Sequence, residues 1–284
     1  MEIIIGKYSG FCSGVKYTVN KANKEVDFNK NVYCLGEIVH NERVINDLEK
    51  KGMITINDLS LAPDYSKVIF RAHGESALTY QKASLKNLDI IDLTCGKIRI
   101  IREKIIKEKD DSFILIIGKK NHPETIGTLS FAGLNSLIIE NKEDLLTALD
   151  TIKNSNLNKL YIISQTTFSS SKFDEIVDYI KNNCSLEIKV DKSICDATEK
   201  RQNEVRELSK EVDKMIIIGG KNSSNTKELY LIAKDILDYV YLIQDVDDLD
   251  LSKFKSSDKV GIMGGASTPN SIIIEVQEKL NSLI

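Results

Sequence analysis

The chain of 284 residues lacks the features that mark several common functional classes. It has no apolar run of the ~18 residues that cross a bilayer, and its first residues have neither the basic nor the long apolar part of a signal peptide. Its net charge is −3 and no face-sized run of Lys and Arg occurs, so nothing indicates a nucleic-acid partner. Five cysteines without a secretory signal favour a reducing compartment. We therefore expect a cytoplasmic protein with no nucleic-acid and no membrane partner.

Prolines are also scarce, with only three in the chain, and short apolar runs alternate with segments of helical period. The runs are rich in Ile and Val and nearly continuous, which is typical of parallel strands buried on both faces. Helical stripes lie between them, such as the one formed by Val15, Val19, Ala22 and Val26. The pattern predicts strands at 2–5, 32–35, 67–71, 88–91, 112–117, 136–139, 159–163, 186–190, 214–218, 239–243 and 259–263.

This alternation predicts an α/β protein with small, mostly parallel sheets covered by helices. The length is two or three times that of a typical domain of ~100–150 residues. We expect three pseudo-equivalent α/β domains, at residues 1–95, 96–195 and 196–284. The first strand is the one element that we expect to be able to pack outside its own domain.

One passage occurs three times: a cysteine, a helical stretch, an apolar strand, a glycine and a polar turn. The cysteines that begin it are Cys12, Cys95 and Cys195. The glycines that follow at nearly equal spacing are Gly36, Gly118 and Gly219, and the polar residues at matching places beyond them are His40, His122 and Ser223. The best-matched copies read I-I-G-K-K-N-H-P-E-T at 116–125 and I-I-G-G-K-N-S-S-N-T at 217–226. Such a repeat predicts that the cysteines and loops surround one centre.

Each repeated cysteine follows an extended segment and begins a helix, where the positive end of the helix dipole favours a thiolate. Three converging thiolates can hold zinc with one open position, or a 4Fe–4S cluster with one iron lacking a protein ligand. There is no C-x-x-C pair, and the spacing does not choose between these two groups. Cys34 and Cys184 fall outside the repeat, and we expect both to be structural.

Polar residues gather just beyond the predicted strands, and in parallel sheets ligands bind at that edge. The three histidines of the chain all lie there: His40, His73 and His122. The other polar loops are residues 163–167, 221–226 and 264–269. Their hydroxyl, amide and backbone N–H donors suit an anion, and together they are able to surround a diphosphate without lysine or arginine. Glu124 is a candidate proton donor if it is enclosed.

These motifs, taken in order, resemble a known enzyme family. They are G-F-C-S-G-V, V-H-N, A-H-G, T-C, H-P-E-T-x-G-T, S-Q-T-T, I-C-D-A-T-x-x-R-Q, K-N-S-S-N and A-S-T-P. The set is similar to that of the 4-hydroxy-3-methylbut-2-enyl diphosphate reductases, the LytB (IspH) family, and it covers the chain from residue 10 to residue 270. The resemblance implies a cloverleaf of three α/β domains around a central 4Fe–4S cluster.

The resemblance also implies roles for individual residues in these motifs. The implied cluster ligands are Cys12, Cys95 and Cys195. The residues implied to hold the substrate diphosphate are His40, His73, Ser223, Ser224, Asn225 and Ser267. Those implied around the substrate hydroxyl are His122, Thr166 and Glu124, with Gln165 and Thr167 lining the pocket. Glu124, acting through Thr166, would supply the proton with which the hydroxyl leaves as water.

The implied reaction is a reductive loss of hydroxyl, with two electrons and two protons consumed and water released. It is the last step of the methylerythritol phosphate route and yields isopentenyl and dimethylallyl diphosphate. A ferredoxin or flavodoxin is the implied electron donor. The residues alone leave three other classes open: a quinolinate-synthase-like 4Fe–4S enzyme, a zinc-binding or redox-sensing protein without catalysis, and a Cys–His hydrolase.

The chain departs from the family pattern at two places. The family usually has proline after its middle cysteine, whereas Gly96 and Lys97 follow Cys95 here. We expect the glycine to loosen this turn without removing the ligand. The family usually has an aliphatic residue after A-H-G, whereas this chain has Glu75. A carboxylate that faced the phosphates would repel them, so we expect Glu75 to turn outward at the start of a helix.

Overall fold

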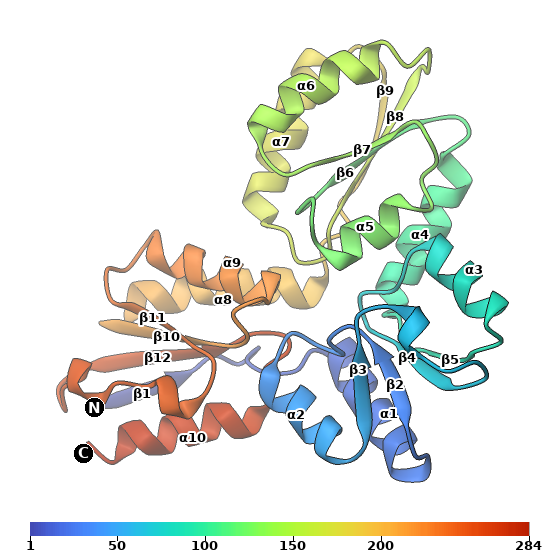
Figure 1. The fold of residues 1–284 in the computed structure, drawn as a ribbon. Coiled ribbons are helices and arrows are strands. Elements are labelled where there is room, and N and C mark those ends of the chain that lie inside the picture. The colour runs from blue at the N-terminus through green and yellow to red at the C-terminus, as the bar shows by residue number, and fades with distance from the viewer. Residues whose placement is uncertain (284) are drawn as a thin grey trace. The chain divides into compact units, whose positions relative to one another are not determined.

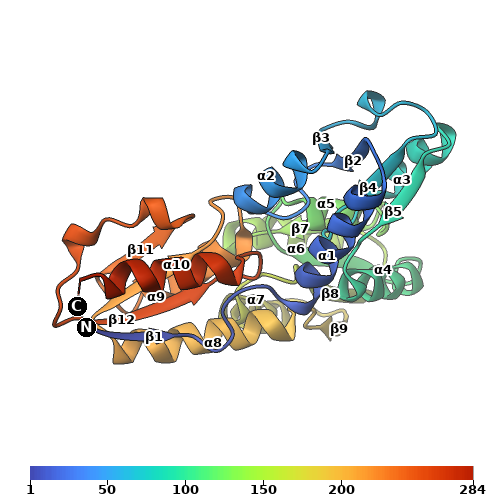
Figure 2. The ribbon, with the colours of Figure 1, turned by 90° about the horizontal axis from the view of Figure 1, so that it is seen from below.

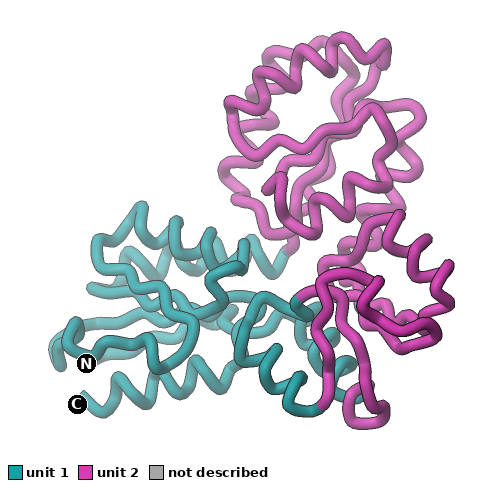
Figure 3. The backbone as a smooth tube through the Cα atoms, viewed as in Figure 1, with its two compact units in different colours: residues 1–24, 37–51, 196–284 teal, residues 25–36, 52–195 magenta. Residues whose placement is uncertain are grey.

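The computed structural model describes residues 1–283, which form two compact units (Figure 3). Unit 1 comprises residues 1–24, residues 37–51 and the C-terminal part of the chain from residue 196. Unit 2 comprises residues 25–36 and 52–195. Within the described part of the chain, none of the helices combines the length and the apolar character needed to cross a membrane.

Three four-stranded sheets form the framework, and every strand pair in them is parallel. Sheet A, in unit 1, has the order β1-β12-β10-β11, with β1 Glu2–Ile5, β10 Lys214–Ile218, β11 Val240–Ile243 and β12 Lys259–Gly264. Sheet B, in unit 2, has the order β3-β2-β4-β5, with β2 Val32–Leu35, β3 Met53–Ile56, β4 Lys67–Phe70 and β5 Asp89–Asp92. Sheet C, also in unit 2, has the order β7-β6-β8-β9, with β6 Phe113–Ile117, β7 Ser136–Ile139, β8 Lys159–Ser164 and β9 Glu187–Asp191.

Ten α-helices and three short 3₁₀ helices connect the described strands (Figure 1). The helices of unit 1, with α1 crossing into unit 2, are α1 Ser13–Phe28, α2 Glu42–Lys50, α8 Asp196–Glu211, α9 Ser224–Lys234 and α10 Asn270–Asn281, with η2 Val246–Asp248 and η3 Leu251–Lys253. Those of unit 2 are α3 Ala77–Leu85, α4 Gly96–Glu108, α5 Pro123–Leu129, α6 Lys142–Lys153 and α7 Ser170–Asn183, with η1 Leu59–Leu61. Helix α5 begins at Pro123, as expected for proline at a first helical position.

Sheet A is covered on both faces (Figure 1). Helix α10 packs Ile272 and Val276 against one face, together with Ile216 and Ile262 from the strands. Helices α8 and α9 cover the other face, which explains why the strands are apolar at nearly every position. The N-terminal strand β1 lies beside β12, with Ile3 opposite Val260 (Figure 2). The first strand therefore does pack outside residues 6–95, on the sheet formed by the end of the chain.

The two sheets of unit 2 each have four strands and are covered by helices. Helices α6 and α7 cover one face of sheet C, and α4 and α5 cover the other, where Ile101 and Ile105 of α4 are buried. Helix α3 and η1 cover a face of sheet B through Ala83 and Leu59. The buried residues of each element follow the apolar stripes of the sequence, and their removal from water supplies the main driving force for folding.

The predicted fold class, α/β with small parallel sheets, is confirmed. Eleven predicted strands are present within a residue or two of their expected bounds, and one strand, β3, was not predicted. Its four residues M-I-T-I lie at the edge of sheet B and are only half buried, so they lack the continuous apolar run of a central strand. The domain boundaries at residues 95 and 195 stay a prediction.

Candidate active site

Each repeated cysteine occupies the same position relative to its own sheet. Cys12 follows β1 and precedes α1, Cys95 follows β5 and caps α4, and Cys195 follows β9 and precedes α8. The backbone N–H of each donates to a carbonyl just beyond the adjacent strand: Ala266 at 3.1 Å, Ala72 at 3.0 Å and Thr166 at 2.9 Å. The repeat seen in the sequence is therefore a repeat of backbone hydrogen bonding.

The three thiols of the repeat are partly exposed, and none of them belongs to a disulfide in the described part of the chain. Cys34 is instead buried within β2, with its sulfur 3.3 Å from the carbonyl oxygen of Gly36. Cys184 lies at the C-terminal end of α7, where no helix dipole favours a thiolate. At Cys12, the backbone N–H of Val15 lies 3.4 Å from the sulfur and can donate to it. Thiols at the starts of helices, outside any disulfide, fit the ligands of a thiolate-bound metal group.

In unit 2, Glu124 lies in the first turn of α5 and is buried, with 4% of its surface exposed. The backbone N–H of Thr166 donates to one carboxyl oxygen at 2.6 Å, and the Thr166 hydroxyl donates to the other at 2.7 Å. Burial raises the pKa of Glu124, while the Thr166 hydrogen bonds and the positive charge of Arg102 oppose the rise. A carboxyl with a raised pKa keeps its proton to higher pH than an ordinary glutamate does, and it can give that proton to a leaving group. The predicted pairing of Glu124 with Thr166 is present.

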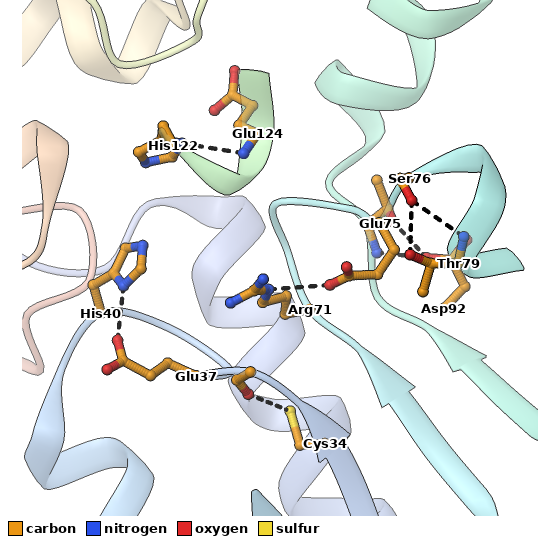
Figure 4. Close-up of polar contacts among 12 residues, drawn as sticks. Cys34, Glu37, His40, Arg71, Glu75, Ser76, Thr79, Asp92, His122 and Glu124 are labelled. Carbon is orange, nitrogen blue, oxygen red and sulfur yellow. Dashed lines mark hydrogen bonds and ion pairs between the residues drawn. The ribbon is translucent and has the colours of Figure 1, made fainter. Parts of the chain in front are cut away.

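His122 caps the same helix turn. Its Nδ1 accepts the backbone N–H of Glu124 at 3.1 Å, which places the proton of the neutral ring on Nε2 (Figure 4). The ring of His73 stands edge-on to it, with 5.4 Å between the centroids and an angle of 86° between the planes. Two predicted imidazoles and the predicted carboxyl thus belong to one part of unit 2. The orientation of His122 makes Nε2 a donor, the form that suits a substrate oxygen.

Gln165 and Thr167 lie in the same loop as Thr166, and their side chains make hydrogen bonds within the protein. The Gln165 amide nitrogen donates to the Thr167 hydroxyl at 2.9 Å, and its oxygen accepts the backbone N–H of Lys119 at 3.0 Å. A Cβ on Gly118 would lie 2.7 Å from Cβ of Gln165, so only glycine permits this approach. These contacts indicate that Gln165 joins the loops after β6 and β8.

In unit 1, the loops after β10 and β12 meet the segment that carries His40. The Ser267 hydroxyl donates to the backbone carbonyl of His40 at 3.2 Å. A Cβ on Gly220 would lie 2.1 Å from that same carbonyl oxygen, so a side chain there would separate the loops. Nδ1 of His40 lies 2.8 Å from a carboxylate oxygen of Glu37, which orients the ring (Figure 4).

Helix α9 begins beside these residues. Ser223 caps it, and the hydroxyl oxygen of Ser223 accepts the backbone N–H of Thr226 at 3.3 Å. Ser224 and Asn225 lie in the first turn, and both are buried. Asn225 is 3% exposed, yet neither its amide nitrogen nor its amide oxygen has a partner in the described part of the chain. A buried amide without partners is costly, and a bound anion would satisfy its donor together with the N–H groups of the helix turn.

The expectation for Glu75 was wrong. Glu75 does not turn outward but is buried, with 8% of its surface exposed. Its carboxylate accepts a hydrogen bond from Nε of Arg71 at 3.1 Å (Figure 4). Burial raises the pKa of Glu75, and the charges of Arg71 and Arg102 oppose the rise. Two internal cations, rather than solvent, account for the position of this carboxylate.

Two buried arginines near the site were not among the predicted site residues. Arg201 donates from Nη2 to the Gly10 carbonyl at 2.6 Å and from Nη1 to the Ala197 carbonyl at 2.7 Å, so it supports the segment before Cys12. It is the arginine of the motif I-C-D-A-T-x-x-R-Q, which was its signal in the sequence. Arg102 lies on α4 among Ile98, Ile101 and Ile105, and its place in that apolar stripe was the signal that it is buried.

Comparison with known proteins agrees with these features. The family described as LytB protein matches residues 3–281. The 4-hydroxy-3-methylbut-2-enyl diphosphate reductases of Alkaliphilus oremlandii and Clostridioides difficile are 37% and 35% identical to the chain, and each alignment covers 100% of both proteins. The protein of that name from Fusobacterium nucleatum is 38% identical, and the chain spans 34% of its length.

Two solved structures are also similar. The E-1-hydroxy-2-methyl-but-2-enyl-4-diphosphate reductase of Plasmodium falciparum superposes with a TM-score of 0.87 at 32% identity, covering 99% of this chain and 87% of the other. A structure of (E)-4-hydroxy-3-methyl-but-2-enyl diphosphate reductase, described as the terminal enzyme of the non-mevalonate pathway, gives a TM-score of 0.71 at 35% identity and covers 99% and 100%. On its sequence and its fold, the chain belongs to the LytB family.

Proposed function

We propose that the chain is a 4-hydroxy-3-methylbut-2-enyl diphosphate reductase. The reaction removes the substrate hydroxyl reductively and yields isopentenyl and dimethylallyl diphosphate, as the last step of the methylerythritol phosphate route. Two electrons and two protons enter, the C–O bond breaks, a C–H bond forms and water leaves. The full-length relationship to reductases of this name supports the assignment.

The observation that carries the mechanism is the enclosed Glu124 carboxyl, with Thr166 bonded to both of its oxygens. A hydroxide ion is a poor leaving group, so the C–O bond breaks readily only if the departing oxygen receives a proton. Glu124 can deliver that proton through Thr166. The Thr166 hydroxyl would give its own proton to the substrate oxygen and would take up the proton of Glu124. Nε2 of His122 is a second donor for the same oxygen. Solvent then restores the proton of Glu124.

The substrate diphosphate fits the polar residues that the chain buries. We assign its binding to His40, His73, Ser223, Ser224, Asn225 and Ser267. The strongest support is Asn225, whose amide is buried without a partner in the described chain at the first turn of α9. An anion there gains the amide donor, the serine hydroxyls and the positive end of the helix dipole. We assign the walls of the substrate pocket to Gln165 and Thr167, which bond to each other.

The three repeated cysteines would hold one 4Fe–4S cluster through their thiolates. When bound, such a cluster supplies electrons, and the iron without a protein ligand is a Lewis acid for the substrate oxygen. Three thiolates would also suit zinc, but zinc has no redox chemistry and the reaction consumes two electrons. The electrons would come from a reduced ferredoxin or flavodoxin.

The test is an assay of protein purified without air. Iron and sulfide are measured first, and about four of each per chain are expected for one 4Fe–4S cluster. The substrate is then added with reduced methyl viologen as electron donor, and both products are followed by mass spectrometry. Protein that holds its full complement of iron and sulfide but forms neither product would contradict the proposal.

A pair of cysteine variants provides the matched control for the ligand assignment. Cys95→Ser should lose most of the bound iron, because the sulfur lies in the repeated position at the start of α4. Cys184→Ser should keep its iron, because that thiol lies at the opposite end of a helix and outside the repeat. Equal iron content in the two variants would remove Cys95 from the ligand set.

A further inference from the structure

Arg102 is a buried cation close to the proposed proton donor. Only 6% of its surface is exposed, and its guanidinium lies over the ring of Phe131, 4.9 Å from the ring centroid. Nε and Nη2 have no hydrogen-bond partner in the described part of the chain. A buried charge held so weakly by hydrogen bonds depends on neighbouring charges for its stability.

Two glycines leave the space that this guanidinium fills. A Cβ on Gly74 would lie 2.6 Å from Nη2 of Arg102, and a Cβ on Gly127 would lie 2.7 Å from it. Gly74 also has a φ of +71°, which only glycine adopts easily. Gly127 belongs to α5, one turn after Glu124, and Gly74 follows His73 directly. Arg102 therefore packs between the helix of the proton donor and the loop of a substrate-binding histidine.

The groups that favour the charged form of Arg102 come from sheet B, the loop after β4 and helix α3. Burial lowers the pKa of Arg102, and Tyr80, Asp92 and Glu75 act in the opposite direction by favouring its charged form. Glu75 is itself buried and bonded to Arg71 (Figure 4). The carboxylate of Glu75 thus partly balances the positive charges of Arg71 and Arg102.

The groups that face Glu124 can be named element by element. Helix α4 contributes Arg102, which favours the ionised carboxylate. The loop after β4 contributes His73, whose ring stands edge-on to that of His122, and α5 itself contributes His122. Strand β7, which also packs on α5, has the sequence SLII and contributes no titratable group.

We propose that Arg102 is a positioning residue for the proton donor, supporting α5 and setting the proton affinity of Glu124, and that Glu75 is the counter-charge that allows this guanidinium to be buried. The inference rests on the proposed function, in which Glu124 gives up a proton. Burial alone would make the carboxyl hold its proton too tightly to transfer it well. A nearby guanidinium weakens that hold, and Glu75 limits how far it does so. Glu75, the departure from the family pattern, thereby acquires a role.

The test measures the protonation of Glu124 directly. The infrared absorption of protonated carboxyl groups is followed against pH, and the contributions of Glu124 and Glu75 are identified by their loss in Glu124→Gln and Glu75→Gln. The variants compared are Arg102→Gln, Arg102→Lys and Glu75→Gln, with Arg206→Gln as control because its guanidinium is exposed and bonded to the side chain of Asn203. The pH profile of turnover is recorded for each.

Removal of the cation in Arg102→Gln should move the Glu124 midpoint to higher pH by about one unit, the low end of the effect of an adjacent opposite charge. Arg102→Lys keeps the charge and should restore most of the shift. Glu75→Gln leaves Arg102 less balanced and should move the midpoint the other way, to lower pH. The control should not move it. The pH profile of turnover should shift in the same directions.

A Glu124 midpoint that stays in place in Arg102→Gln, or moves to lower pH, would overturn the inference. Should Arg102→Gln fail to fold, Glu75→Gln decides, since a midpoint that is unmoved or raised there would overturn it equally. The infrared measurement needs no turnover. Wild-type protein that forms no product but shows these midpoints would refute the proposed function and leave the role of Arg102 standing.

Discussion

The first turns of α5 and α9 occupy matching places in the repeat, but their polar side chains differ in hydrogen bonding. His122 and Ser223 both cap their helix by accepting a backbone N–H. Two residues later, Glu124 has both carboxyl oxygens bonded within the protein, whereas Asn225 has neither amide atom bonded in the described chain. In the first turn of α5 the polar groups are hydrogen-bonded without a ligand, and Glu124 can hold a proton there. In the first turn of α9 the Asn225 amide is left without partners in the described chain, as expected for a ligand site.

The next position of the repeat shows the same contrast. The hydroxyl of Thr125 donates to the carbonyls of His122, at 2.9 Å, and Lys119. The hydroxyl of Thr226, which is equally buried, has no partner in the described chain. The same residue type therefore has a bonded hydroxyl in one loop and, among the described residues, an unbonded hydroxyl in the other. The two loops differ in whether their polar atoms are hydrogen-bonded before a ligand arrives, and each part of that statement can be tested.

The largest effect is expected from Glu124→Gln. The amide keeps the shape of the side chain but cannot donate a proton as an acid does, so kcat should fall roughly 10²–10⁴-fold. Iron content and KM should stay close to those of the wild type, because neither the thiols nor the proposed diphosphate site changes. Activity near that of the wild type would exclude Glu124 as the proton source.

Asn225→Ala should act on binding instead. A hydrogen bond to a charged group contributes about 1.5–3 kcal/mol, so KM should rise roughly tenfold to a hundredfold while kcat changes less. The stability of the substrate-free protein should change little, because loss of an unpaired buried amide offsets the small cavity that it leaves. Urea unfolding with and without substrate measures both. An unchanged KM would mean that Asn225, in the first turn of α9, does not bind the substrate.

The pH dependence of turnover should arise from Glu124 in the first turn of α5 and not from the first turn of α9. The pKa of Glu124 is raised by burial, so the protonated donor persists to higher pH than an ordinary glutamate, and turnover should fall as pH rises through that pKa. Its contribution to stability has the same sign: it is fully present below the unfolded pKa and is lost as pH rises through the folded one. Asn225 does not titrate and should add no such limb. The residual activity of Glu124→Gln should lack it, which a pH profile of kcat will show.

The smallest effects are expected from a matched pair, Thr125→Val and Thr226→Val. Thr125→Val removes a hydroxyl that donates to two carbonyls and should lower the free energy of unfolding by about 1–2 kcal/mol. Thr226→Val removes a hydroxyl without a partner in the described chain and should change it by less than about 0.5 kcal/mol. Equal losses in the two variants, measured by urea unfolding, would show that the Thr226 hydroxyl is satisfied in solution.

The central strands and the cysteine helices could be predicted from the sequence, because buried parallel strands and helix faces leave regular apolar patterns. The edge strand β3 could not, because its four residues M-I-T-I form only a short apolar run that a threonine interrupts. The bonding of Glu124 to Thr166 was implied by family motifs, and no spacing in the chain indicates it. The position of Glu75 could not be predicted, because it depends on Arg102, which the fold brings near, as well as on Arg71, four residues earlier in the chain.

The pairing of β1 with β12 has a consequence for the order in which the protein is made. Strand β1 is synthesised first, but its partner emerges from the ribosome only after residue 264, so sheet A must wait for almost the whole chain. Cys12 likewise obtains its backbone partner only when Ala266 has been added. Sheets B and C use strands that are already complete by residue 191. Of the three repeated cysteines, the first to be translated is therefore the last to be fixed in place.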